Sequence, residues 1–227
     1  MASLEKLGLE YVDLYYCHRM TSLEGAMEFA ASAKRLKEEG LIQAIGLSEI
    51  RGSWLKKVYT EVCPINAVQQ EWSLMTRNLE DELVPVCKEL GVVIVAYSPL
   101  YRNFLTSVSG SAPTDWRGTL PRYQGEAFDK NLQLMKEVML PLADKFSCSL
   151  AQLSLAWLFH RAEEMGVVVI PIPGSTKITN VTSNKGSTEI EINVEDMKAL
   201  NSMADKVVGE RGGKDYTSGG IENQADL

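Results

Sequence analysis

Four polar or aromatic side chains stand at or near the ends of apolar runs in this sequence. They are His18, Ser48, Gln69 and Tyr97. A neutral imidazole can donate a hydrogen bond to a carbonyl oxygen and so orient and polarise it. A side-chain amide offers both a donor and an acceptor, and an aromatic face can stack on a flat ring. Each of the four is therefore a candidate functional residue.

Each candidate also has a plain structural interpretation. His18 can be a satisfied histidine at a strand end, and Ser48 can cap a following helix. Gln69 can hydrogen-bond nearby backbone, as buried amides often do. Tyr97 can simply close one end of the core. The residues alone leave these alternatives open.

A second group of candidates follows the apolar run 167–172. Gly174 precedes Ser175, Thr176 and Lys177, and a helix is expected to begin just after them. Hydroxyl groups and the free N–H groups of a helix N-terminus form an anion site, to which a lysine adds positive charge. Lys177 as a solvated surface residue is the alternative.

The elements that must position these residues alternate between strand and helix. A continuous apolar run such as 92–97 is typical of a strand buried on both faces of a parallel sheet. The alternation predicts βαβ units and an α/β fold with a parallel sheet. The strands are expected at 11–16, 43–47, 67–70, 92–97 and 167–172, the first of them buried. Among the helices, Thr21 is expected as an N-cap, Gly91 as a helix end and Asn193 as an N-cap, and one helix is expected over about 130–145.

One connection, 101–129, is much longer than the others. Long loops inside compact domains are usually functional. Trp116, Arg117 and Tyr123 could line a substrate pocket there, or they could be loop packing. Both interpretations stand at this point. From Gly209 the chain is polar and rich in glycine, so a flexible tail is expected over 209–227, after a single domain over 1–208.

Composition narrows the function classes. The formal net charge is -7 and no block of Lys and Arg stands out, which argues against binding to nucleic acid or an acidic membrane surface. No apolar run approaches the ~20 residues that a membrane span needs. The 4 cysteines are scattered and there are 2 histidines, so we expect reduced thiols in a cytoplasmic protein and no metal site. The oligomeric state cannot be predicted.

Five motifs, in order, give the sequence a family resemblance. They are LGLEYVDLYYCHR at 7–19, EEGLIQAIGLSEI at 38–50, AVQQEWSLMTR at 67–77, VVIVAYSPL at 92–100 and VVVIPIPGSTKITNVTSN at 167–184. Together they resemble the aldo-keto reductases, in a plant- and bacterial-type branch that reduces aldehydes and ketones with NADPH. The resemblance covers residues 2 to about 207 and implies a (β/α)8 TIM barrel.

The resemblance also implies roles for individual residues. His18 matches the histidine that lies beside the substrate carbonyl. Ser48 and Gln69 match residues that bind the nicotinamide carboxamide, and Tyr97 matches the tyrosine that stacks under the nicotinamide ring. The remaining cofactor residues implied are Ser98, Leu100 and Arg102 near the pyrophosphate, and Gly174, Ser175, Thr176, Lys177 and Asn184 around the adenosine 2′-phosphate.

Three departures from the family pattern concern the cofactor. Many relatives read Gly-Arg-Gly where this chain has Tyr101, Arg102 and Asn103. Because glycine permits close backbone approach, closure of this loop over the cofactor is in question. Asn180 stands where many members have Arg, and Ser183 where many have Glu, which predicts a weaker hold on the phosphate and adenine.

The resemblance places His18 on the fourth barrel strand rather than the first. We therefore expect a partial barrel that lacks the first three βα units, and with them the family's upstream Asp, Tyr and Lys. The leading interpretation is an NADPH-dependent enzyme of carbonyl reduction with impaired activity. The alternatives are a catalytically silent NADP(H)-binding or partner-binding protein, and an incomplete gene product that does not fold stably.

Overall fold

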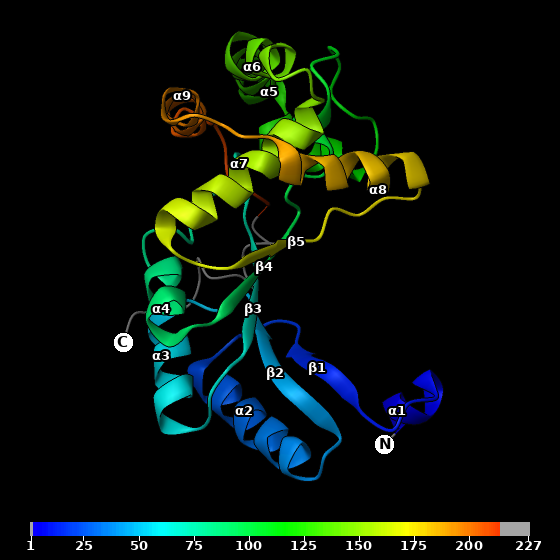
Figure 1. Cartoon of the computed structure of the whole chain (residues 1–227), viewed down its shortest axis with the longest axis vertical. Helices are drawn as coiled ribbons and strands as arrows, with labels where there is room; N and C mark the ends of the chain where they lie inside the picture. Colours follow the sequence, from blue (N-terminus) through cyan, green and yellow to red (C-terminus); the bar gives the residue numbers. More distant parts are fainter. Residues whose placement is uncertain (1, 214–227) are drawn as a thin grey trace. The chain divides into compact units, whose positions relative to one another are not determined.

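The alternation of strands and capped helices is present in the computed structural model, which describes residues 2–213 (Figure 1). The described chain forms two compact units. One contains residues 2–70 and 79–95, and the other contains residues 71–78 and 96–213.

Five strands form one sheet in the order β1-β2-β3-β4-β5, as expected for consecutive βα units. β1 (Val12–Cys17) pairs in parallel with β2 (Ile42–Ser48), and β2 pairs in parallel with β3 (Ala67–Glu71). β4 (Val93–Tyr97) and β5 (Val169–Pro171) complete the order. The fold is therefore α/β with a parallel sheet.

The helices of the first unit cover its part of the sheet. α2 (Leu23–Glu38) packs on β2, and α3 (Gly52–Glu61) packs against α2 and α4 (Leu83–Leu90) (Figure 1). The short α1 (Ala2–Leu7) precedes β1. α2 turns a face of alanines toward the core, so its backbone lies close to β2. The alanines are Ala26, Ala30 and Ala33, all buried.

The expectation that the first strand is buried was wrong. Every residue of β1 is exposed or half-buried, and Leu14 and Tyr15 are 37% and 41% exposed. β1 is the first strand in the sheet order, and among the described residues its backbone pairs with β2. A strand that lies at the edge of a sheet cannot be covered as a central strand is.

Helix ends follow local chemistry. Ser22, rather than the expected Thr21, is the N-cap of α2, where its hydroxyl accepts from the N–H of Gly25 at 3.0 Å. α4 ends at Gly91, which adopts a left-handed conformation with φ 68°. Asn193 caps α9 as predicted and accepts from the N–H of Asp196.

The second unit is mostly helical. The predicted helix 130–145 begins earlier and contains a π-helical turn, Met135–Met139, just before Pro141. Proline lacks the N–H that an α-helix would use, so the register of hydrogen bonds changes there. The helices are α5 (Gly125–Leu134), α6 (Leu140–Lys145), α7 (Leu150–Met165), α8 (Ile178–Lys185) and α9 (Val194–Ala204), with 3₁₀ turns Phe104–Thr106, Trp116–Thr119, Pro121–Tyr123 and Gly186–Glu189.

The chain around the start of the expected tail makes hydrogen bonds within the second unit. Asn131 exchanges two hydrogen bonds with the backbone of Val208, each 2.9 Å long. Arg122 Nε donates to the carbonyl of Gly209 at 2.8 Å, and Arg211 is 2% exposed. These side chains bind the backbone at Val208 and Gly209, and the expectation of a flexible tail over 209–227 stays a prediction. The remainder of the expected tail, 214–227, lies outside the described residues.

Within residues 2–213, no helix has the length and apolar character needed to cross a bilayer. The same part of the chain holds no cluster of His, Cys, Asp and Glu side chains arranged to bind a metal ion. The four cysteines are free thiols, with Cys63 and Cys87 buried.

Candidate functional site

In the first unit, the candidate residues lie at one edge of the sheet. His18 follows β1 directly and its side chain is exposed. Ser48 is the last residue of β2, and Gln69 lies opposite it in β3. Because parallel strands point the same way, their carboxyl ends meet at one edge, which is where α/β folds place their ligands. The fold thus brings His18, Ser48 and Gln69 to the same edge.

Ser48 is not a helix cap. Helix α3 begins at Gly52, and its N-cap residue is Arg51. Ser48 is 6% exposed at the strand end, and the N–H of the next residue, Glu49, donates to the carbonyl of Gln69 at 3.1 Å. Glu49 is also buried, with Arg19 Nη1 3.9 Å from its carboxylate. The structure therefore excludes Ser48 as the N-cap of α3.

In the second unit, Tyr97 ends β4 and is half-buried. Its hydroxyl accepts a hydrogen bond from Arg211 Nη1 at 3.0 Å. A polar contact at the tip and a partly open ring are compatible both with an aromatic platform and with a residue that closes the core, so the stacking role stays a prediction. Arg211 was not among the sequence candidates, and the only signal for it was an arginine in a segment otherwise rich in glycine.

The loop after β4 adopts the backbone conformation that glycine favours, without glycine. φ is 47° at Ser98, 42° at Tyr101, 52° at Arg102 and 76° at Asn103. A left-handed conformation costs an ordinary residue roughly 1–2 kcal/mol, so surrounding contacts must hold it. The loop thus keeps a glycine-like conformation despite its sequence departure.

Buried aromatic packing holds this loop. Tyr101 is fully buried and lies between two guanidinium groups, 5.1 Å from Arg102 and 5.0 Å from Arg122, measured to the ring centroid. The hydroxyl of Tyr123 lies 3.0 Å from the carbonyl oxygens of both Tyr101 and Arg102. Burial raises the pKa of Tyr101, and Arg122 opposes that shift. The buried Tyr101 ring and the Tyr123 hydroxyl thus both hold the backbone of the loop.

Arg102 does not present a free guanidinium. Its Nη1 and Nη2 donate to the two carboxylate oxygens of Glu71 at 2.9 and 3.1 Å. The bidentate bond to phosphate that the sequence suggested would need the same nitrogens. Arg102 still lines a cavity beside the loop, so its cofactor role stays a prediction.

Two cavities in the second unit gather most of the remaining candidates. The first, of about 260 Å³, lies between the loop after β4 and the segment after β5. The second, of about 360 Å³, shares Leu100, Asn103 and Gly174 with it. The first is lined by Ser98, Pro99, Leu100, Arg102, Asn103, Ile172, Pro173 and Gly174, and the second by Leu100, Asn103, Thr106, Ser149, Ala151, Gly174, Asn180, Ser183 and Asn184.

The expected anion site is found only in part. Helix α8 begins at Ile178, as expected, with Lys177 as its N-cap. Ser175 Oγ is bound to the backbone of Lys177 at 3.1 Å, and Ser175, Thr176 and Lys177 are exposed beside the cavities rather than lining them. Their phosphate role, and the surface alternative for Lys177, both remain open.

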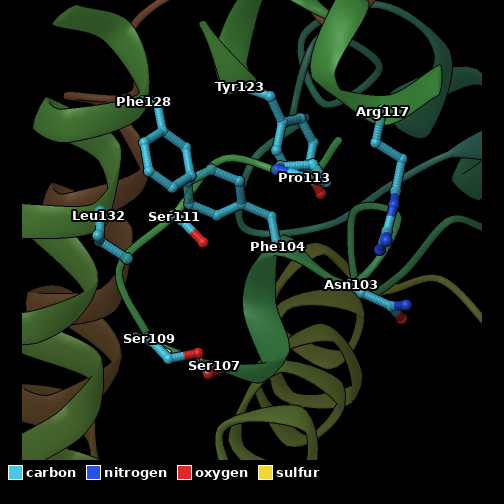
Figure 2. Close-up of a pocket in the computed structure, with 10 residues that line it drawn as sticks. All are labelled: Asn103, Phe104, Ser107, Ser109, Ser111, Pro113, Arg117, Tyr123, Phe128 and Leu132. Atoms are coloured by element: carbon cyan, nitrogen blue, oxygen red, sulfur yellow. Dashed lines mark hydrogen bonds between the residues drawn. The ribbon is translucent and has the colours of Figure 1, made fainter. Parts of the chain in front are cut away.

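The long loop forms a separate pocket of about 170 Å³ (Figure 2). The rings of Phe104, Tyr123 and Phe128 gather on one side of it, with Ser107 and Ser109 away from them. Tyr123 is 4% exposed and is part of the aromatic packing already described.

Trp116 and Arg117 divide between the two interpretations of the loop. Trp116 is 61% exposed and does not line the pocket of Figure 2. Arg117 lines it, but its Nε and Nη2 bind Asp115 and its Nη1 donates to the carbonyl of Arg102. The contacts of Arg117 favour loop packing, and a substrate role for either residue remains a prediction.

The sequence matches one family model over most of its length. The family model described as "Aldo/keto reductase family" matches residues 1–205. The chain therefore belongs to the aldo/keto reductase family.

Solved structures agree. A glycerol dehydrogenase, AKR11B4, from Gluconobacter oxydans is 26% identical with a TM-score of 0.79, over 92% of this chain and 63% of its own. A thermostable aldo-keto reductase, Tm1743, solved with the inhibitor epalrestat, is 26% identical with a TM-score of 0.69, over 88% of this chain and 63% of its own. An aldo-keto reductase from a Medee basin deep-sea metagenome library is 24% identical with a TM-score of 0.66, over 94% of this chain and 68% of its own, and shows likeness of fold. The chain thus spans 63% of the length of the first two structures.

Proposed function

We propose that this chain binds NADPH and takes part in transferring a hydride to the carbonyl carbon of an aldehyde or ketone. The observation that carries the proposal is the pair of adjoining cavities between the loop after β4 and the start of α8. The second cavity joins hydroxyl and amide groups to the N-terminus of α7, where Ser149 and Ala151 line it, and this setting suits a phosphate-bearing ligand. NADPH, when bound, supplies the hydride.

The second unit would hold the body of the cofactor. Ser98, Leu100 and Gly174 would line the pyrophosphate, with Asn184 toward the adenosine side. Ser175, Thr176 and Lys177 would bind the 2′-phosphate from the exposed turn before α8. The half-buried ring of Tyr97 would support one face of the nicotinamide.

For the first unit by itself, the proposed roles are those that the family resemblance implies. Ser48 and Gln69 would bind the carboxamide, and His18 would donate a hydrogen bond to the substrate oxygen. Polarising a carbonyl favours hydride attack, but the developing alkoxide also needs a proton donor. None of the residues assigned here is such a donor, so we expect NADPH binding with slow turnover.

Binding and turnover can be measured separately. NADPH is titrated into the 227-residue chain while protein fluorescence is followed, with NADH in parallel, and consumption of NADPH with 4-nitrobenzaldehyde is followed at 340 nm. Saturable binding with slow turnover supports the proposal. Binding with no turnover favours the alternative, a catalytically silent NADP(H)-binding protein. Absence of any NADPH binding would sink both.

A matched pair of variants tests the location. Asn184→Ala removes an amide that lines the second cavity, and Asn78→Ala makes the same change at an exposed position. We expect the first to weaken NADPH binding about tenfold, as the loss of one or two hydrogen bonds would. The second should bind as the unchanged chain does. Equal affinities for the two variants would contradict the assignment of the cavity.

A further inference from the structure

Arg211 reaches the candidate cofactor site from the C-terminal segment of the second unit. It lies 114 residues along the chain from Tyr97, and its Nη1 donates to the hydroxyl of Tyr97 at 3.0 Å. The same nitrogen donates to Oε2 of Glu71 at 3.1 Å. The Arg211 side chain is 2% exposed and that of Glu71 is fully buried. A buried, charge-assisted hydrogen bond of this kind is short and directional, so it fixes its acceptor closely.

The backbone of Arg211 makes a second link. Its carbonyl oxygen accepts from the hydroxyl of Tyr101 at 3.0 Å. Tyr101 belongs to the left-handed stretch after β4, where the conformation of each residue must be held by its neighbours. Arg211 is therefore tied to the tyrosine that ends β4 and also to the loop that lines both cavities.

Neutralising Glu71 does not by itself require Arg211. The Glu71 carboxylate is already paired with both terminal nitrogens of Arg102, and it also accepts from the hydroxyl of Thr76 at 3.3 Å. The contact that these partners do not make is the one to Tyr97. A role limited to charge balance would leave the Tyr97 hydrogen bond unexplained.

We propose that Arg211 is a positioning residue: it holds the Tyr97 ring and the loop 98–103 in the conformation that receives the nicotinamide half of the cofactor. The inference rests on the proposed NADPH function. Arg211 acts through Tyr97 and Tyr101 and need not touch the cofactor. In the proposed binding mode the adenosine half would lie around Asn180 and Asn184 of α8, which no contact described above links to Arg211, so the nicotinamide half should respond more strongly to changes at Arg211.

The test compares two ligands on the full 227-residue chain. NADPH carries both halves, whereas adenosine 2′,5′-bisphosphate carries the adenosine and its phosphates without the nicotinamide. Dissociation constants for both are measured by fluorescence or calorimetry. The variants are Arg211→Met, Arg211→Lys and Tyr97→Phe, with Arg35→Met on the exposed face of α2 as the matched control.

Arg211→Met should weaken NADPH binding about tenfold, with adenosine 2′,5′-bisphosphate changed less than about twofold. Arg211→Lys should recover most of the loss, because a single nitrogen makes both side-chain bonds. Arg35→Met should change neither ligand. Thermal unfolding of each variant shows whether it remains folded.

Tyr97→Phe keeps the ring, Arg211 and Glu71, and removes only the accepting oxygen. It should weaken NADPH binding about threefold and leave adenosine 2′,5′-bisphosphate unchanged. If Arg211→Met unfolds, the NADPH affinity of Tyr97→Phe tests the positioning role by itself. Equal weakening of both ligands, or unchanged NADPH binding in Tyr97→Phe and Arg211→Met, would overturn the positioning role alone. Failure of the unaltered chain to bind NADPH would overturn the proposed function and this inference with it.

Discussion

Arg102 and Glu71 form a two-point ion pair inside the second unit. The Nη1–Oε1 and Nη2–Oε2 distances are 2.9 and 3.1 Å, and the two side chains are 9% and 0% exposed. Arg211 and Thr76 bind the same carboxylate. Arg102, which the family resemblance assigns to the pyrophosphate, is thus also one of the residues that stabilise the loop after β4.

Glu71→Gln should destabilise the protein strongly. The amide cannot accept at both positions and leaves buried guanidinium groups without their counter-charge, a loss of about 3–5 kcal/mol for a broken buried pair. Urea unfolding followed by circular dichroism measures the change. Glu126→Gln is the control, because Glu126 pairs with Lys130 on an exposed helix face and should show no measurable effect. Similar midpoints for the two variants would show that the buried pair contributes little.

Gly46→Ala should destabilise the first unit through contact with Tyr16. The two residues pair across β1 and β2, and a Cβ at position 46 would lie 2.3 Å from Cε1 of Tyr16. Forcing extra volume into a packed site costs about 1–3 kcal/mol. Gly110→Ala, with nothing within 4 Å of its added Cβ, should be neutral. Adding Tyr16→Leu to Gly46→Ala should restore part of the loss in urea unfolding, and purely additive effects would argue against this contact.

The stability of the protein should respond in opposite ways to loss of the hydroxyl group at two tyrosines, Tyr16 and Tyr123. Tyr16 carries a buried hydroxyl with no hydrogen-bond partner in the described chain, and burial raises its pKa to about 12. Tyr16→Phe should therefore leave stability unchanged or raise it by about 1 kcal/mol. Tyr123→Phe should lower stability by about 1 kcal/mol, because it removes the buried hydroxyl that donates to the loop carbonyls, although these carbonyls keep the N–H of Phe104 and Arg117 Nη1 as donors. Chemical unfolding of both variants checks the pair, and a destabilised Tyr16→Phe would mean that its hydroxyl has a partner.

Stability should fall in alkali. Burial raises the pKa of the Cys87 thiol from 9.0 to about 12, and that of Tyr16 from 10.0 to about 12. Between pH 9 and 12 the unfolded chain loses these protons while the folded chain keeps them, so the unfolded state binds fewer protons and stability decreases as pH rises. The contribution is fully present below pH 9. Each group can account for a slope of up to about 1.4 kcal/mol per pH unit.

The alkaline slope can be assigned to Cys87 by substitution. The free energy of unfolding in urea is measured at pH 8, 9 and 10 under reducing conditions. Cys87→Ala should be less stable at every pH, because it leaves a cavity, but its decline above pH 9 should be shallower. Cys148→Ala, at a half-buried position, is the comparison. Parallel declines of the unchanged chain and Cys87→Ala would exclude the thiol as a source of the effect.

Short-range patterns determined much of this protein. The alternation of apolar runs and helical periodicity predicted all five described strands to within a few residues. Gly91 ends its helix and Asn193 begins its helix, as expected. These features depend on side chains within one turn of each other, so the sequence displays them directly. The motifs around His18, Ser48, Gln69 and Tyr97 also predicted the family, which the family model confirmed.

Tertiary structure decided the contacts between distant segments. Arg211 is hydrogen-bonded to Glu71, which is 140 residues away in the sequence, and to Tyr97, which is 114 residues away. No local sequence pattern predicts either pairing. The exposure of β1 follows from its place at the start of the sheet order, and its apolar composition predicted the reverse. Likewise, Tyr101, which has a left-handed conformation, contacts the Arg122 guanidinium and the carbonyl of Arg211, and both come from distant segments. Sequence determined which residues are available at this site, and long-range packing determined which of them are paired with one another.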